Sequence, residues 1–195
     1  MAGVARSTAS EHLAKLVAAG LVKVRLDGRH RYYSLSAPAV AEALESIEGV
    51  ANTLAQSCHG RSAPARAALH ARCCYDHVAG WVGVRLAEAM FSLNYLEHTR
   101  DGTRLTESGR AWLSSIGVDF DDLQQSPRRL LRLCPDWSEN AIHVGGSVGA
   151  AMLTGFLTRG WMRRKRRSTV LDITPHGKYM FRKTFGLDTG QMCKE

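Results

Sequence analysis

Hydrophobic residues in the first part of the chain recur at two different spacings. Four of them follow the four/three spacing of a single helix face: Ala9, Leu13, Leu16 and Val17. From Leu21 to Leu26 apolar and basic residues alternate, Asp27-Gly28 is a type I′ turn signal, and Arg29 to Leu35 adds aromatic and basic side chains. The pattern predicts a short helix with Ser7 as its N-cap and Gly20 just past its end, and then a β-hairpin.

On the predicted helix and hairpin, the side chains outside the apolar pattern are small, polar or cationic. A helix face of this kind can approach base edges in the major groove of DNA. Long cationic side chains around a hairpin tip can reach phosphates or a minor groove. We therefore expect DNA contacts from ten residues: Ser7, Thr8, Ser10, Glu11, Lys15, Arg25, Arg29, His30, Arg31 and Tyr32.

Three stretches, in this order, resemble ArsR-type bacterial repressors. They are Ser7-Thr-Ala-Ser-Glu-His-Leu-Ala-Lys-Leu16, Ala19-Gly20-Leu21-Val22 and Gly28-Arg-His-Arg-Tyr-Tyr33. The resemblance implies a winged helix-turn-helix in which the first stretch is the recognition helix and the others form the wing. Members of that family carry two or three helices ahead of the recognition helix, and Met1 to Arg6 can supply only the turn. We therefore expect residues 1–56 to be a partial winged helix-turn-helix domain.

A second helical stripe follows the hairpin. Pro38 suits the first position of a helix, and five apolar residues follow at alternating spacings of four and three: Val40, Leu44, Ile47, Ala51 and Leu54. This stripe could pair with its copy in a homodimer or pack onto the wing of its own chain, and the pattern fits both.

The remainder of the chain begins with a linker and then repeats itself. Residues 57–65 are small and polar and are broken by Gly60 and Pro64. Beyond them His77-Val-Ala-Gly-Trp-Val-Gly-Val84 aligns with His143-Val-Gly-Gly-Ser-Val-Gly-Ala150 without a gap. We therefore expect a C-terminal effector or dimerisation domain, residues 66–195, made of two related helix/hairpin/helix units at about 65–119 and 122–188. The fold class predicted for the whole chain is mainly α with small β-hairpins, an α+β protein.

Glycines recur inside the repeat. Gly80 and Gly83 correspond to Gly146 and Gly149, a spacing of three in both copies. Because glycine in a helix costs up to about 1 kcal/mol relative to alanine, this spacing predicts close approach of another helix or access for a ligand.

Thiol and imidazole side chains gather near the start of each repeat. Cys73, Cys74, Asp76 and His77 would lie within one and a half turns of a helix, with Cys73 and His77 as an i, i+4 pair. The second repeat offers Cys134, Asp136 and His143. This chemistry suits zinc or another thiophilic metal ion, and the alternative is plain structural burial of cysteines and histidines.

The same stretches resemble a C-terminal extension found in a subset of ArsR-type regulators, with Cys-Tyr-Asp-His and Cys-x-Asp-Trp-Ser-Glu motifs. The family's usual metal motif, Cys-Val-Cys, is absent from the sequence. No metal specificity therefore follows from the resemblance.

Composition narrows the class of protein. The 195 residues are 45% hydrophobic and hold no apolar run near the length of a membrane helix, and no signal-peptide core begins the chain, so we expect a cytoplasmic protein. The formal net charge of +8 favours a polyanionic partner. Five cysteines, an odd number, argue against a disulfide framework.

These observations favour a sequence-specific regulator that binds double-stranded DNA and represses transcription. The alternatives are a sensor that uses the cysteines and histidines of the C-terminal half, and a truncated regulator that acts through protein contacts. An enzyme with Cys73 or Cys74 as nucleophile and His77 as base is not expected, because no third group is placed to orient the base.

Overall fold

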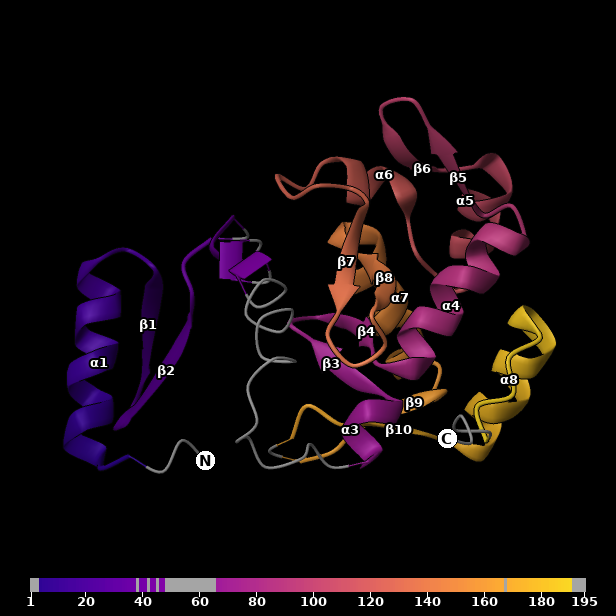
Figure 1. Cartoon of the computed structure of the whole chain (residues 1–195). Helices are drawn as coiled ribbons and strands as arrows, with labels where there is room; N and C mark the ends of the chain where they lie inside the picture. Colours follow the sequence, from indigo (N-terminus) through magenta and orange to yellow (C-terminus); the bar gives the residue numbers. More distant parts are fainter. Residues whose placement is uncertain are drawn as a thin grey trace. The chain divides into compact units, whose positions relative to one another are not determined.

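Contacts divide the chain into two units, residues 1–47 and residues 48–195. The computed structural model describes residues 4–37, 39–41, 43–44, 46–47, 66–166 and 168–190 (Figure 1). The predicted linker, residues 57–65, lies outside these ranges.

The first unit opens with the predicted helix. The helix α1 spans Arg6–Ala18, with Ala5 as its N-cap and no side-chain capping bond, so the prediction that Ser7 caps the helix is wrong. Its end is as predicted: Gly20 has a φ of 71°, its amide donates to the Val17 carbonyl at 3.0 Å, and the Leu21 amide donates to Leu16 at 3.0 Å. A left-handed glycine with this pair of bonds satisfies the last carbonyls of a helix.

The predicted hairpin follows, with its turn one residue later than expected. β1 (Val22–Asp27) and β2 (His30–Leu35) pair antiparallel, and the Asp27↔His30 pair leaves Gly28 and Arg29 as the turn. Gly28 has a φ of 56° and Arg29 is not among the described residues with positive φ. A type I′ turn needs positive φ at both central residues, so this turn is of another class.

The chain is helical again at residues 39–41, 43–44 and 46–47. Leu44 and Ile47 of the predicted stripe are 49% and 63% exposed. Ala51 and Leu54 lie outside the described residues.

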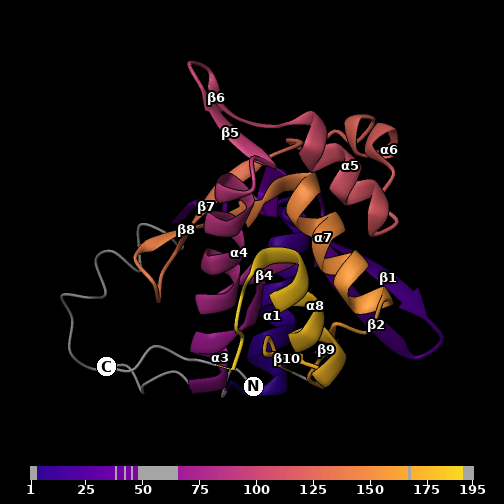
Figure 2. The same ribbon diagram turned by 90° about the vertical axis from the view of Figure 1, so that its right-hand side faces the viewer.

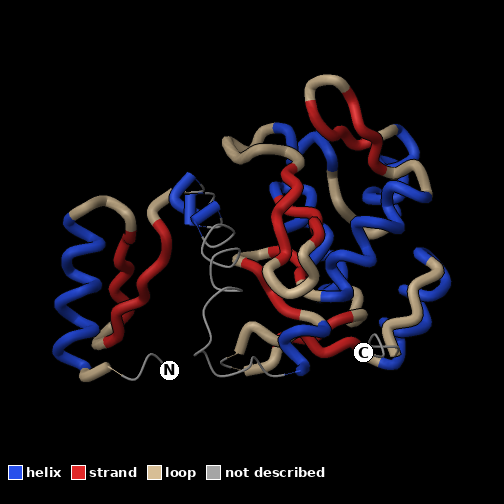
Figure 3. Tube along the Cα trace, viewed as in Figure 1, coloured by secondary structure: helices blue, strands red, loops and turns tan. Residues whose placement is uncertain are grey.

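The second unit alternates hairpins and helices and runs through the same order twice (Figure 3). Its first half contains α3 (Arg66–His70), β3 (Arg72–Cys74), β4 (His77–Ala79), α4 (Trp81–Ser92), β5 (Leu96–Thr99), β6 (Gly102–Leu105) and α5 (Glu107–Ser115). Its second half contains α6 (Phe120–Gln124), β7 (Arg132–Asp136), β8 (Ala141–Gly145), α7 (Gly146–Thr158), β9 (Met162–Arg164), β10 (Leu171–Ile173) and α8 (Pro175–Phe185). Each strand pairs with its neighbour in the chain as a two-stranded antiparallel sheet.

This mixture of helices and small hairpins confirms the α+β class and changes the expected unit. Residues 73–77 were expected in a helix, and they form the hairpin β3–β4 instead, with Cys73 opposite Val78 and a tight turn at Tyr75-Asp76. Hydrogen bonds to a distant segment hold β3 in place: the Cys73 amide donates to the Thr169 carbonyl at 2.7 Å. A contact that the local sequence pattern does not contain thus selects strand over helix.

The two halves share one core. Matching positions of α4 and α7 fill it: Val82 with Val148, Leu86 with Met152, and Met90 with Phe156. The halves are also interlocked, because α4 packs on β8 and α7 packs on β4. The hairpin β5–β6 projects away from this body in both views (Figures 1 and 2).

Within the described ranges, no helix has the length and apolar character needed to cross a lipid bilayer.

Candidate functional site

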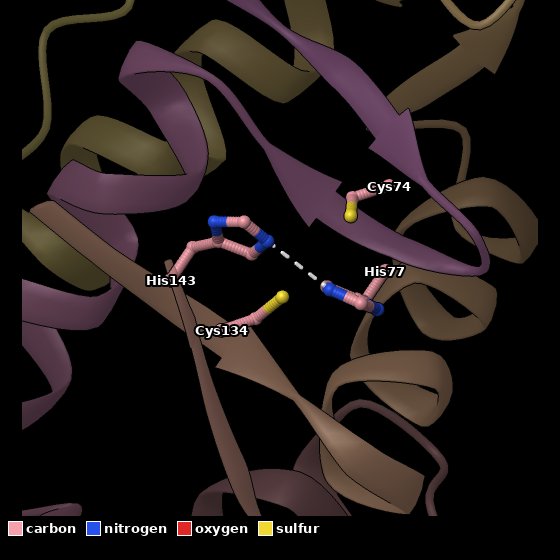
Figure 4. Close-up of side chains that lie close together, drawn as sticks. All are labelled: Cys74, His77, Cys134 and His143. Atoms are coloured by element: carbon pink, nitrogen blue, oxygen red, sulfur yellow. Dashed lines mark hydrogen bonds between the residues drawn. The ribbon is translucent and has the colours of Figure 1, made fainter. Parts of the chain in front are cut away.

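Four ligand-type side chains meet between the two halves of the second unit (Figure 4): Cys74, His77, Cys134 and His143. Their sulfur and imidazole nitrogen atoms all lie within 4.8 Å of one another, and the two Nε2 atoms are 3.1 Å apart. His77, His143 and Cys134 are buried and Cys74 is half-buried. Elsewhere in the described part of the chain, no other three such residues come together in this way.

The two hairpins at the start of the repeats deliver these side chains in the same manner. Cys74 lies directly opposite His77 in β3–β4, and Cys134 lies directly opposite His143 in β7–β8. Directly opposed residues of an antiparallel pair project to the same face of the sheet. The unequal spacings of three and nine residues reflect only how far each hairpin extends beyond its Cys–His pair.

An aspartate faces the other nitrogen of each imidazole. Asp76 Oδ1 lies 3.4 Å from His77 Nδ1, and Asp136 Oδ2 lies 3.0 Å from His143 Nδ1. Each aspartate follows its cysteine by two residues, so both halves carry the same Cys-x-Asp unit. The carboxylates favour the tautomer with the proton on Nδ1 and turn both Nε2 atoms into the cluster.

Asp136 is held on all sides and has no capacity left to bind an ion. Its oxygens accept from Arg72 Nη2 at 2.6 Å, from the Gly80 amide at 2.7 Å and from the Ser138 hydroxyl at 2.8 Å. Burial by itself raises the pKa of this carboxyl group, but contacts with His143, Arg72 and Gly80 outweigh burial and hold its pKa well below its ordinary value. The carboxylate is therefore ionised throughout the physiological range.

Asp76 is less enclosed. Its side chain is 34% exposed and forms an ion pair with Arg128, whose guanidinium lies over the Tyr75 ring. Burial raises the pKa of Asp76, and the neighbouring His77 and Arg128 lower it further than burial raises it. Of the seven residues expected at a metal site, the two aspartates thus orient imidazoles instead of joining the cluster.

Cys73 was expected beside His77 and lies elsewhere. Because alternate residues of a strand face opposite sides, Cys73 turns away when Cys74 faces the cluster. Its thiol donates to the Tyr75 carbonyl at 3.2 Å and accepts from Arg164 Nη1 at 3.3 Å. Burial raises the pKa of Cys73, with Arg164 opposing it in part. The predicted i, i+4 pair is therefore wrong, since it assumed a helix.

The thiol of Cys74 is a weak nucleophile in this setting. Its contact with Cys134 and its burial raise its pKa to about 11, and His143 and His77 only partly oppose this rise. Nucleophilic cysteines need the opposite shift, toward thiolate at neutral pH. Two soft sulfurs and two imidazoles in a closed pocket are a ligand set for a thiophilic metal ion.

The repeated glycines make room for the hairpin that precedes each helix and, at Gly149, for a histidine as well, a role that their spacing alone did not indicate. A Cβ on Gly83 would overlap the Val78 carbonyl oxygen and come within 3.5 Å of His143 Cβ. A Cβ on Gly149 would overlap the Val144 carbonyl oxygen and come within 3.0 Å of His77 Cβ. Both glycines therefore admit the carbonyl group of the preceding hairpin, and Gly149 also admits His77 of the other half, where close approach of another helix or access for a ligand was expected.

Two further residues that shape the site had no assigned role in the sequence. Arg72 pairs with Asp136 across the two halves and stacks over the Trp137 ring at 4.2 Å. Gly145 leaves space beside the His77 ring, which a Cβ would approach to 3.3 Å. Arg72 stands two residues before Cys74 in the chain, and only the fold shows that it contacts the other repeat.

Nine of the ten residues expected to contact DNA are exposed and Thr8 is half-buried, on a unit whose helix α1 has no buried residue. On α1, Thr8 is half-buried, Ser7 and Ser10 are exposed, and an exposed ion pair of 2.8 Å joins Lys15 to Glu11. Such exposed pairs contribute about 0–1 kcal/mol, so both side chains are free to exchange partners.

The hairpin has one polar face and one largely apolar face. Register places Arg25 opposite Tyr32, with the Arg25 guanidinium 5.1 Å from the ring centre, and His30 lies on the same face. Arg29 lies in the turn, and Arg31 lies opposite Leu26 on the other face. The predicted cations thus surround the tip instead of lining one side.

One comparison identifies a relative. Over 183 residues, 94% of this chain and 81% of the relative, the sequence is 33% identical to a protein of Bacillus subtilis (strain 168) described as "Uncharacterized HTH-type transcriptional regulator YdfF". No family model matches the sequence. No solved structure matches it either.

Proposed function

The chain belongs to the HTH-type transcriptional regulators, which are not enzymes. We propose that it is an ArsR-type repressor that binds double-stranded DNA sequence-specifically. In this proposal the first unit is a winged helix-turn-helix, α1 is its recognition helix and β1–β2 is its wing. We expect such a regulator to act in the cytoplasm, where a bacterial chromosome lies.

The observation that carries the proposal is an exposed helix with small and polar side chains beside a hairpin with a cationic tip. Ser7, Thr8, Ser10, Glu11 and Lys15 would face base edges or flanking phosphates from α1. Arg25, Arg29, His30, Arg31 and Tyr32 would hold the backbone from the hairpin. Arg29 and Arg31 have no ion pair with any residue in the described ranges, so they are available for phosphates.

A homodimer is part of the proposal. Leu44 and Ile47 lie on a helical stretch and expose apolar side chains, which supports pairing between copies. Two copies would place two recognition helices on neighbouring half-sites of a palindromic operator. The second unit would serve dimerisation or reception of an effector.

A gel-shift assay with DNA from upstream of the protein's own gene tests the proposal. Lys15→Ala is expected to lower specific affinity by about 1–3 kcal/mol if the side chain reads a base. Arg31→Ala is expected to weaken binding to all sequences alike and to reduce the salt dependence by about one unit of slope. Arg104→Ala, at an exposed position of the second unit, is the matched control and is expected to change neither quantity.

Two outcomes would contradict the proposal. Equal affinity for the operator and for shuffled DNA of the same composition would exclude sequence-specific binding. A loss of affinity in Arg104→Ala as large as that in Arg31→Ala would show that net charge, and not the hairpin tip, carries binding.

A further inference from the structure

We propose that the second unit binds one Zn²⁺ ion through Cys74 Sγ, Cys134 Sγ, His77 Nε2 and His143 Nε2, and that the ion joins the two repeats. This site is independent of the DNA-binding role, because all four residues belong to the second unit. Two ligands come from each repeat, one cysteine and one histidine from each hairpin.

The spacing of the ligand atoms suits a small tetrahedral ion. Zinc bonds of about 2.0–2.3 Å give a tetrahedron with edges of roughly 3.3–3.8 Å. The imidazole nitrogens are 3.1 Å apart and no pair of ligand atoms exceeds 4.8 Å. No separation therefore exceeds the longest edge of that tetrahedron by more than about 1 Å.

The arrangement of the two imidazole rings suits a cation between them. Asp76 and Asp136 face the two Nδ1 atoms, so the proton of each neutral ring belongs on Nδ1. The two Nε2 atoms lie 3.1 Å apart (Figure 4). With both protons on Nδ1 a bound cation accepts both Nε2 lone pairs, whereas without a cation one ring has to carry its proton on Nε2 and donate it to the other.

Carboxylates that orient the ligand histidines are a further feature of known metal sites. A histidine that binds zinc nearly always donates its other ring N–H to a carboxylate, a carbonyl group or water. Here an aspartate of the same Cys-x-Asp unit lies 3.4 Å from Nδ1 of His77 and 3.0 Å from Nδ1 of His143, although the hairpins differ in length. Two independent hairpins thus arrive at the same inner and outer set of groups.

Burial and ligand chemistry select the class of ion. His77 is 0% exposed, and His143 and Cys134 are each 1% exposed, so the ion would sit in a closed site of the structural type. Two sulfurs and two nitrogens in a tetrahedron favour Zn²⁺ and disfavour Mg²⁺ and Ca²⁺, which prefer oxygen ligands. Cys74, which is half-buried, is the most accessible of the four ligands.

The test titrates the full-length chain, reduced and stripped with a chelator, with Co²⁺ as a spectroscopic probe and then with Zn²⁺. One equivalent of Co²⁺ is expected to produce intense tetrahedral d–d bands and thiolate-to-cobalt charge transfer, and one equivalent of Zn²⁺ to displace it. Elemental analysis of the protein after dialysis against Zn²⁺ gives the stoichiometry directly.

Matched cysteine variants locate the site. Cys74→Ser and Cys134→Ser are expected to weaken Co²⁺ binding by at least about 100-fold, since even outer-sphere partners contribute about 10–100-fold. Cys73→Ser is the control, because that thiol faces away from the cluster, and it is expected to bind Co²⁺ like the natural chain. Cys74 is half-buried, so its serine variant tests binding even where Cys134→Ser fails to fold.

Thermal unfolding supplies a readout that does not depend on spectra. Zn²⁺ is expected to raise the melting temperature of the natural chain and of Cys73→Ser, and to leave that of Cys74→Ser unchanged. The proposal is overturned if Cys74→Ser binds Co²⁺ as tightly as the natural chain, or if the Co²⁺ spectrum shows only the weak bands of octahedral coordination. It is also overturned if Cys74 and Cys134 form a disulfide and the protein binds no Zn²⁺.

Discussion

The two repeats of the second unit form the same Cys–His–Asp arrangement, but the contacts that hold the aspartate differ between them. In both, a hairpin places a cysteine opposite a histidine, and an aspartate two residues after the cysteine faces the ring. Asp136 is 3% exposed and held by several donors, whereas the Asp76 side chain is 34% exposed and relies on Arg128. The Cys–His pairs are thus alike in the two repeats, and the surroundings of the two aspartates differ.

The difference shows what each half contributes besides its ligands. Asp136 also binds Arg72 and the Gly80 amide of the first repeat, so it ties the halves together whatever occupies the cluster. Asp76 pairs with Arg128 of the second repeat, whose side chain is only 8% exposed, so it also connects the halves. We infer that both hairpins tie the repeats together and that the first one does so beside solvent.

The largest expected effect comes from removing the two carboxylate charges one at a time. Asp136→Asn is expected to lower the free energy of unfolding by about 3–5 kcal/mol, because it leaves the buried Arg72 charge without its partner. Asp76→Asn is expected to cost less, about 1–3 kcal/mol, because the Asp76 side chain is 34% exposed although Arg128 is only 8% exposed. Tryptophan fluorescence during denaturation measures both, since all four tryptophans lie within residues 81–161.

The denaturation experiment is run with a chelator and a reductant, so that neither a bound metal ion nor a disulfide contributes to the difference in stability between the two variants. Equal losses of stability in the two variants would contradict the unequal support of the repeats.

A smaller effect is expected from the paired glycines. Gly149→Ala is expected to cost about 3 kcal/mol and Gly83→Ala about 2 kcal/mol, because the Cβ added at Gly149 would lie closer to the Val144 carbonyl oxygen than the one added at Gly83 to that of Val78, and at Gly149 it would also press on His77 (3.0 Å). Because alanine has a better helix propensity than glycine, up to about 1 kcal/mol of this loss in stability is offset in both variants. Denaturation as above gives the two values, and a larger loss in Gly83→Ala would reverse the comparison.

The smallest expected effect concerns the helix caps that the repeats share. Thr174 accepts from the Gly177 amide at 2.9 Å, and Thr106 accepts from the Gly109 amide at 3.1 Å. Thr174→Ala is expected to cost about 1 kcal/mol. Thr106→Ala is expected to cost about half as much, because Ser108 lies 2.9 Å from its hydroxyl and donates to the same Asn94 carbonyl.

The double variant of Thr106 and Ser108 to alanine sharpens this last test. If Ser108 takes over the role of the cap, the double variant loses more stability than the sum of the single ones.

Much of this molecule could be predicted from short-range pattern. The helix α1, its glycine end and the hairpin β1–β2 follow from the spacing of apolar residues and from Gly20 and Gly28, whose conformations only glycine adopts freely. The wrong details, the N-cap and the turn class, depend on single dihedral angles that a neighbouring residue can shift.

The cysteine cluster could be predicted only in part. Its four members were among the seven candidate residues, because thiol and imidazole groups recur near the start of both repeats. The pairing was wrong, since a helix would join Cys73 to His77, and the strand joins Cys74 to His77 instead. Hydrogen bonds from β3 to the segment at Thr169 decide between them, and no local pattern contains a partner almost a hundred residues away.

The sequence by itself determined the exposed helix and hairpin of the first unit, the repeat, and the residue types available to a site, because all of these depend on neighbours within a few residues. The tertiary structure alone decided which candidates meet. Packing of α4 on β8 and of α7 on β4 turns two distant hairpins toward one point, where two histidines face each other and two aspartates hold them from behind. That convergence depends on contacts between the halves, which chain spacing does not encode.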